Sequence, residues 1–211
     1  MMAFDLKRQA AKLAAPVAVA AVLGLAAVGT ASAENIHERG TITSVEGSVV
    51  KVKDRDGKDV MFNLDDGWKI VGASKATMAD IKPGVFIGTA TVGEDTGMKA
   101  VEVVVFPEAM KGTGEGHYAW DLQPGGKTMM TNATVNNEVK GTDGKSVTLT
   151  YKGGEKKVDI KDGTPIVQLG EATKADLVPG AKVFINAPGM TGDKIEKGAV
   201  VVGKDGVTPP M

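Results

Sequence analysis

The side chains best suited to binding or chemistry gather in one short stretch between residues 112 and 122. Its members are Glu115, His117, Tyr118, Trp120 and Asp121. The whole chain has two His, two Trp, two Tyr and 4% aromatic residues, so this gathering is informative. The glycines before it permit tight turns, and loops on a rigid scaffold often carry function. We therefore take residues 112–122 as the candidate recognition element.

Two interpretations of this stretch need no metal. In the first, Tyr118 and Trp120 fill a gap between two parts of the fold, and His117 donates hydrogen bonds. In the second, Tyr118 and Trp120, with His117 and Asp121 beside them, bind a sugar, a peptide or another small ligand. Tyr and Trp suit that role because each has an apolar face and a polar edge.

A third interpretation is a divalent-metal site. Glu115, His117 and Asp121 would supply the ligands, with His37 and Glu38 as further donors. The pattern offers one good nitrogen ligand without a second histidine nearby, whereas zinc sites usually combine several. A copper version would draw on the thioethers of Met110, Met129 and Met130, which suit Cu(I). Scattered methionines are more often core residues. No other cofactor is expected.

Catalysis is disfavoured by what the sequence lacks. There is no cysteine nucleophile and no G-x-S-x-G elbow, and two histidines leave little choice of general base. The glycine-rich segments do not match the spacing of a phosphate-binding loop. The sequence therefore predicts a protein that is not an enzyme.

The first 33 residues have the pattern of a secretory signal peptide. Lys7, Arg8 and Lys12 precede an apolar run rich in Ala, Val and Leu, and a small-residue cleavage pattern ends at Ala33. The mature chain would carry a net charge of −3 and no cysteine. Without a basic patch, binding to nucleic acid or to an anionic membrane is disfavoured. We expect a soluble periplasmic or secreted protein.

The rest of the chain contains an internal repeat. The nonapeptide at residues 76–84 returns at residues 172–180, and the segment 66–71 returns at 162–167 in the same register. In each copy two alternating apolar runs flank a Gly-bearing polar turn, which predicts a hairpin. An additional strand precedes each hairpin, and two more close each copy.

The nonapeptides have a structural explanation. Thr77 with Asp80, and Thr173 with Asp176, resemble capping boxes at the start of a helical turn. The apolar residue that follows, Ile81 in the first copy, would enter the core before a Pro-Gly pair ends the turn. We expect the two aspartates to cap backbone amides and not to bind ligands.

Five short strands with a helical turn between the third and fourth are typical of a small OB-like barrel. The sequence thus predicts an all-β protein of two tandem five-stranded barrels with short helical turns, after an N-terminal signal helix. The expected divisions are 1–33 (signal peptide), 34–106 (first repeat), 107–130 (inter-repeat loop) and 131–211 (second repeat). The alternative is a β-sandwich in which both copies share one core.

This arrangement of paired strands, a Thr-capped turn, an Asp-Leu/Ile-x-Pro-Gly step and closing valine strands resembles a family of uncharacterised exported bacterial β-barrel repeat proteins. Relatives are sometimes labelled metal ABC transporter permease, but a permease needs several membrane spans. The resemblance covers residues 38–203 and implies an OB-like fold and a periplasmic location. We expect a binding or envelope-associated protein whose partner is a small ligand or an envelope protein. The rival expectation is a structural protein to which a partner adds strands.

Overall fold

The fold is nearly all β. The computed structural model describes residues 35–65, 67–93, 97–122, 127–195 and 197–209, and its strands form one continuous hydrogen-bonded sheet. The predicted all-β class and the small-barrel architecture are confirmed. The predicted signal peptide, residues 1–33, lies outside the described residues. Within them, no helix has the length and apolar character needed to cross a membrane.

The strands of the first repeat are β1 (Ile36–Glu46), β2 (Val49–Asp54), β3 (Asp59–Asn63), β4 (Lys69–Lys75), β5 (Phe86–Val92) and β6 (Met98–Val105). The strands of the second repeat are β8 (Thr128–Lys140), β9 (Gly144–Tyr151), β10 (Gly154–Lys161), β11 (Ile166–Glu171), β12 (Lys182–Ala187), β13 (Lys194–Ile195) and β14 (Ala199–Gly203). Between the repeats lies β7 (Gly116–Trp120), and the 3-10 turns are η1 (Met78–Asp80), η2 (Glu108–Met110) and η3 (Lys174–Asp176).

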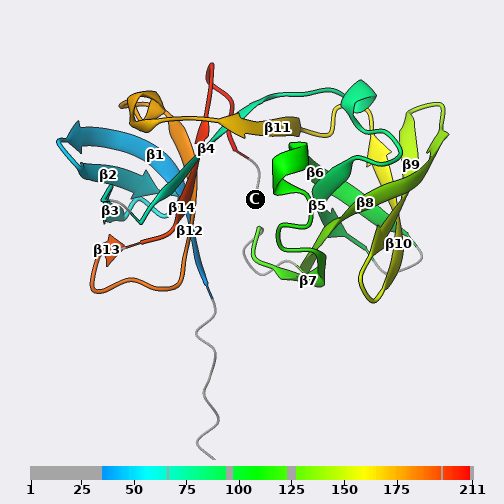
Figure 1. Cartoon of the computed structure of the whole chain (residues 1–211), viewed down its shortest axis with the longest axis horizontal. Coiled ribbons are helices and arrows are strands. Elements are labelled where there is room, and N and C mark those ends of the chain that lie inside the picture. The colour runs from blue at the N-terminus through cyan, green and yellow to red at the C-terminus, as the bar shows by residue number, and fades with distance from the viewer. Residues whose placement is uncertain (1–34, 66, 94–96, 123–126, 196, 210–211) are drawn as a thin grey trace, which may run out of the picture. The chain divides into compact units, whose positions relative to one another are not determined.

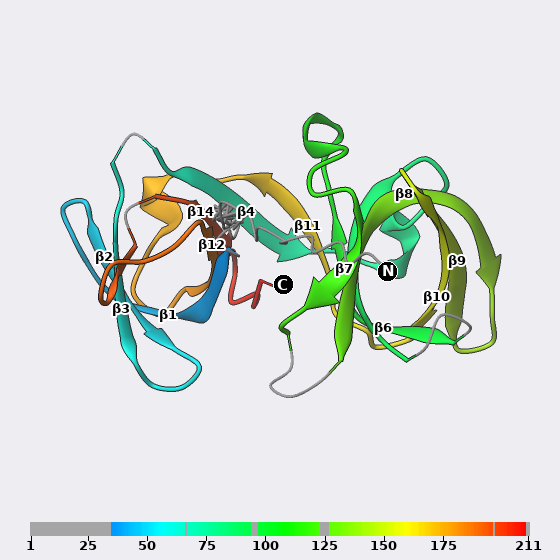
Figure 2. The same cartoon turned by 90° about the horizontal axis from the view of Figure 1, so that it is seen from below.

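One closed barrel is formed by the middle of the chain, and we call it the central barrel. Its strands are neighbours in the order β10, β9, β8, β5, β6, and β10 pairs back to β6 in parallel. Val103, Val147, Leu149 and Val158 are fully buried in its core. Figure 2 shows these strands curving around a common interior.

Strands from the two ends of the described chain form the terminal barrel. The order is β14, β12, β1, β2, β3, and β3 pairs in parallel with the short strand β13. Val50, Phe62, Ile185 and Val202 are fully buried inside it. In Figure 1 its blue strands come from the start of the chain and its orange and red strands from the end.

Each barrel therefore takes strands from both repeats. The repeat at 34–106 gives three strands to the terminal barrel and two to the central barrel, and the repeat at 131–211 does the reverse. The expected boundaries mark repeats in the sequence and do not mark barrels. The local patterns fit either arrangement, because each strand buries the same face in both.

We call this sharing of strands between the repeats the exchange. It passes through one strand in each repeat that the sequence analysis did not expect. β4 and β11 run between the two barrels and pair with each other in antiparallel fashion. Ala73 lies opposite Leu169 in this ladder, and these residues are also equivalent positions of the two repeats. The pair therefore lies on an approximate two-fold axis that relates the repeats.

The two capped turns behave as predicted. The main-chain N–H of Thr77 donates to Asp80 Oδ2 at 2.8 Å, and that of Thr173 donates to Asp176 Oδ2 at 2.7 Å. These hydrogen bonds lower the pKa of both carboxyls. Ile81 and Leu177 then enter a core, with 0% and 3% of their surfaces exposed.

The exchange makes a prediction about these two side chains. Ile81 belongs to the first repeat but packs in the central barrel, whereas Leu177 packs in the terminal barrel. Ile81→Ala and Leu177→Ala should each cost about 2–5 kcal/mol, through lost burial and a residual cavity. In hydrogen exchange, Ile81→Ala should weaken the protection of β8 and β9, and Leu177→Ala that of β1 and β2. Weakened protection of β1 and β2 in Ile81→Ala would argue against the exchange.

Candidate functional site

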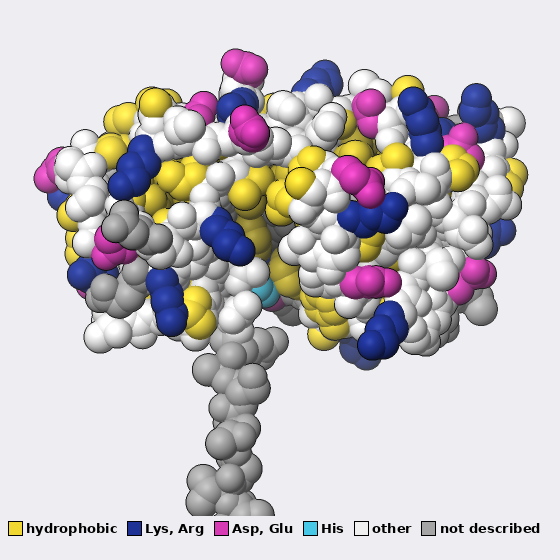
Figure 3. All heavy atoms as spheres, in the orientation of Figure 1, with side chains coloured by type: hydrophobic (Ala, Val, Ile, Leu, Met, Phe, Trp, Pro, Cys, Tyr) yellow, Lys and Arg dark blue, Asp and Glu magenta, His cyan; other side chains and the backbone are white. Residues whose placement is uncertain are grey.

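The two barrels meet over a third, smaller core. Phe86, Val104 and Phe106 contribute from the central barrel, and Phe184 and Val201 from the terminal barrel. Figure 3 shows hydrophobic side chains in the seam between the barrels, while Lys, Arg, Asp and Glu are mixed over the rest of that face. The inter-repeat segment packs against this core through Met110 and Trp120.

The inter-repeat segment is not a loop throughout. It contains the turn η2 and the strand β7, and β8 begins at Thr128, inside the range 107–130. β7 pairs in antiparallel fashion with the start of β8, from Gly116 opposite Asn132 to Trp120 opposite Thr128. This pairing orders the stretch that the sequence singles out.

The repeats differ where β7 is anchored. Gly88 lies opposite Asn132 in the central barrel, and the equivalent pair in the terminal barrel is Phe184 opposite Arg39. A Cβ at Gly88 would lie 2.5 Å from Asn132 Oδ1, so the absent side chain makes room for this amide. Asn132 Nδ2 in turn donates to the Tyr118 hydroxyl at 3.1 Å. Partial burial raises the pKa of Tyr118.

At its far end, β7 reaches the terminal barrel. The indole of Trp120 packs on the His37 ring with centroids 4.4 Å apart, and the Arg39 guanidinium lies 5.7 Å from the indole centroid. The same guanidinium lies 5.0 Å from the centroid of Phe184, within the range of a cation–π contact. We call His37, Arg39, Trp120, Asp121 and Phe184 the junction cluster.

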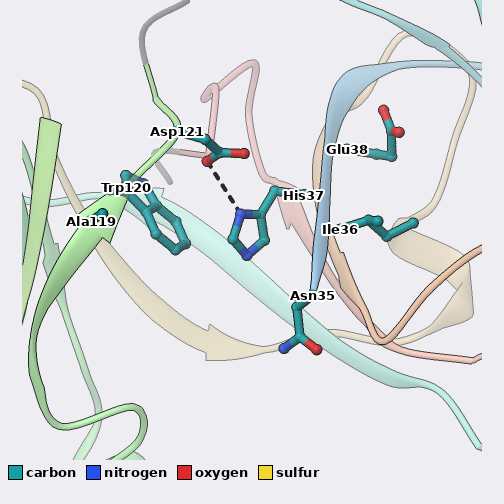
Figure 4. Close-up of a pocket in the computed structure, with 7 residues that line it drawn as sticks. All are labelled: Asn35, Ile36, His37, Glu38, Ala119, Trp120 and Asp121. Carbon is teal, nitrogen blue, oxygen red and sulfur yellow. Dashed lines mark ion pairs between the residues drawn. The ribbon is translucent and has the colours of Figure 1, made fainter. Parts of the chain in front are cut away.

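Asp121 holds the cationic part of this cluster. Its Oδ1 accepts a hydrogen bond from Arg39 Nη2 at 2.8 Å and lies 3.2 Å from His37 Nδ1. Figure 4 shows the His37 ring directed toward both Trp120 and Asp121. Partial burial alone would raise the pKa of Asp121, but the hydrogen bond and charge of Arg39, with His37, outweigh burial and lower it. An ionised Asp121 thus compensates a guanidinium whose side chain is only 8% exposed.

Of the residues considered as metal donors, His37 and Asp121 come together, whereas Glu115 and His117 lie beside other partners. Glu115 accepts a hydrogen bond from the main-chain N–H of Lys152, His117 Nδ1 lies 2.9 Å from Thr131 Oγ1, and Asp121 binds Arg39. Across the part of the chain that the structure describes, no three His, Cys, Asp or Glu side chains form a group that could hold a metal ion.

Two of the three methionines considered for copper pack on separate apolar cores, and the third is buried. Met110 packs on the core between the barrels, and Met129 packs on the core of the central barrel. Met130 is 2% exposed. The geometry thus gives these thioethers the role of core residues.

A groove with a volume of about 560 Å³ lies beside the junction cluster. One wall is the start of β1, residues 35–38, and the other is the end of the inter-repeat strand, residues 119–121. In Figure 4 the side chains of Ile36 and Glu38 point away from Trp120, so these residues present mainly the main chain of β1 on that side. By register, this part of β1 is equivalent to the part of β8 that pairs with β7.

Sequence reasoning found only part of the junction cluster. Trp120 and Asp121 were candidates, and His37 was considered only as a metal ligand. Arg39 and Phe184 were missed because they are distant in sequence and have neither a motif nor a matching residue in the other repeat. Their proximity follows from the exchange, which brings β12 beside β1.

Comparisons with protein-family models, with curated proteins and with solved structures find no match to this chain. The fold and the site define a two-barrel β protein in which β7 pairs with the central barrel and contacts the terminal barrel through Trp120. We call this bridging contact of β7 the clamp.

The clamp predicts a stability difference between two aromatic residues of β7. Trp120→Ala removes packing against His37, Arg39 and Phe184, whereas Tyr118 is 37% exposed. Trp120→Ala should lower the free energy of unfolding by less than the roughly 3–5 kcal/mol of a fully buried aromatic, since Trp120 is only partly buried. It should still cost clearly more than Tyr118→Ala. Equal effects in denaturant unfolding would contradict the clamp.

The ion pair predicts a pH dependence. Because the native pKa of Asp121 lies below its ordinary value, its stabilisation is complete above about pH 4 and is lost as the pH falls through the native pKa. The difference in unfolding free energy between the wild type and Asp121→Asn should therefore be constant near neutral pH and shrink in acid. Glu155→Gln, at an exposed site on β10, is the control. A difference that grows in acid would refute the assignment.

Proposed function

We propose that this chain is an exported, non-enzymatic binding protein that takes an extended polypeptide segment into the groove beside the junction cluster. Export rests on the predicted signal peptide. The observation that carries the ligand class is the state of β7. Every described strand longer than two residues has a strand neighbour on each side, except β7, which has only β8.

The alternation of main-chain groups indicates what β7 offers to a ligand. Val135 exchanges main-chain hydrogen bonds with Gly84 and Val85 on the β5 side of β8. By alternation, Met130 turns its main chain toward β7, where its partner is Tyr118. The N–H and C=O of Ala119, the next residue, therefore face away from β8. Ala119 is exposed and lines the groove.

An extended peptide could pair with the free edge of β7 and become an additional strand of the sheet. Main-chain hydrogen bonds supply affinity and alternate side chains supply specificity. Glu38 and Asp121 are the charged residues of the groove lining, which contains neither Lys nor Arg. This composition favours a neutral or basic segment over an acidic one.

A sugar platform receives less support from the same geometry. One side of the Trp120 indole is packed against His37, and Arg39, Phe184 and Tyr118 also surround it. A flat ligand would compete with these contacts. The indole is better placed to form the end of a groove than to be its open floor.

The test uses linear peptides selected from a random display library against the mature chain. The selected peptides should be poor in Asp and Glu and should lose binding to Ala119→Arg, which fills the groove. Thr150→Arg, an exposed position on β9, is the matched control and should bind normally.

A backbone readout separates strand addition from other binding. N-methylation of alternate peptide amides should abolish binding, while methylation of the intervening amides should be tolerated, because only alternate amides face one neighbouring strand. Binding that ignores the position of the methyl groups, or that survives Ala119→Arg, would exclude the proposal. A selection that yields no binders would also count against it.

A further inference from the structure

A second cavity, with a volume of about 490 Å³, shares no lining residue with the groove. Its lining joins the two barrels, because Lys53, Arg55 and Lys182 come from the terminal barrel and Glu102 from the central barrel. The inter-repeat segment contributes Leu122. A concave site between two rigid units is a common location for a small-molecule ligand.

The interior of this cavity is mostly apolar. Leu122 is half-buried and Pro165 is exposed, so both present apolar surface to the cavity, whereas Val183 packs in the core of the terminal barrel. The guanidinium-bearing side chain of Arg39 is also buried there. A ligand with a short hydrocarbon body would remove the surfaces of Leu122 and Pro165 from water, which is favourable in proportion to the apolar area covered.

The charge around the cavity is opposite in sign to that of the whole chain. Four basic residues line it, against the two acidic residues Asp54 and Glu102. The chain as a whole carries a net charge of −1. Asp54 Oδ1 is engaged by the main-chain N–H groups of Asp56 and Lys58, at 2.9 and 2.7 Å. Glu102 is buried and is already engaged in a polar or electrostatic interaction.

Two of the cations donate to neutral acceptors. Arg55 Nη1 donates to the main-chain oxygen of Leu122 at 3.0 Å, and Lys182 Nζ donates to Thr41 Oγ1 at 2.7 Å. Neither has a carboxylate partner among the described residues. Lys53 differs, because its Nζ lies 2.8 Å from Asp59 Oδ1. Arg55 and Lys182 can therefore receive an anion without breaking an ion pair.

We propose that this cavity binds a small organic anion, namely a carboxylate or phosphate monoester attached to a short apolar body. Arg55 and Lys182 hold the anionic group at the rim. Leu122 and Pro165 cover the apolar body. The site is separate from the peptide groove, and its occupation does not depend on the function proposed for that groove.

Hexyl phosphate is the probe, titrated into the mature chain by calorimetry, with inorganic phosphate and hexanol as partial ligands. Hexyl phosphate should bind more tightly than either, because it has both the charge and the apolar body. Arg55→Gln and Lys182→Gln should each weaken binding roughly tenfold, which is the scale of one charge-assisted hydrogen bond. Lys157→Gln, at an exposed site on β10, should change nothing. Higher salt should weaken binding because the rim cations are exposed.

A second arm identifies the source of the anion. Vesicles containing phosphatidic acid, a phosphate monoester lipid, that bind the wild type but not Arg55→Gln would assign the cavity to a lipid headgroup. Binding of soluble hexyl phosphate without vesicle binding would assign it to a free metabolite. If hexyl phosphate does not bind, or binds Arg55→Gln and Lys182→Gln as tightly as the wild type, the proposal fails. None of these results bears on peptide binding, which is read at Ala119.

Discussion

The connection between the two barrels depends on the ladder between β4 and β11. These strands carry each repeat from one barrel to the other, and their antiparallel pairing holds the crossing point. β14 adds to β4 in parallel, and β6 adds to β11 in the same way. The last strand of each barrel is therefore attached to the crossing ladder. The ladder thus couples the two barrels, whereas the central barrel is closed by its own pairing of β10 with β6.

The site arises where this symmetry is broken. Gly88 and Phe184 occupy equivalent places, but the glycine leaves room for β7 and Asn132, while the phenylalanine packs on Arg39. The inter-repeat segment has no counterpart in the second repeat, so one barrel receives a sixth strand and the other receives the tip of that strand. A buried guanidinium, a half-exposed carboxylate and two aromatic side chains then join surfaces that the repeats alone would leave apart. The groove and the cavity both lie along this junction.

The sequence predicted what depends on local rules. The capping role of Asp80 and the burial of Ile81 followed from spacing, and the strands flanking the hairpins followed from alternation. β4 was missed because Gly72 interrupts its short apolar run. β7 was missed because a five-residue strand between glycines resembles a loop. The exchange of strands itself leaves no local signal. Val135 on β8 would pair with an equivalent strand whether that strand came from its own repeat or from the other one. Arg39 could be placed beside Asp121 only once the exchange was known.

The arrangement of the barrels sets an order for their assembly. The central barrel is continuous in sequence and has all its strands once Lys161 has emerged. The terminal barrel begins with Ile36 but lacks β12 and β14 until Gly203 has emerged. As the chain is made from its N-terminus, β1, β2 and β3 therefore keep their apolar faces uncovered while the central barrel folds. This three-stranded segment is the part of the chain most in need of protection from aggregation and proteolysis during synthesis.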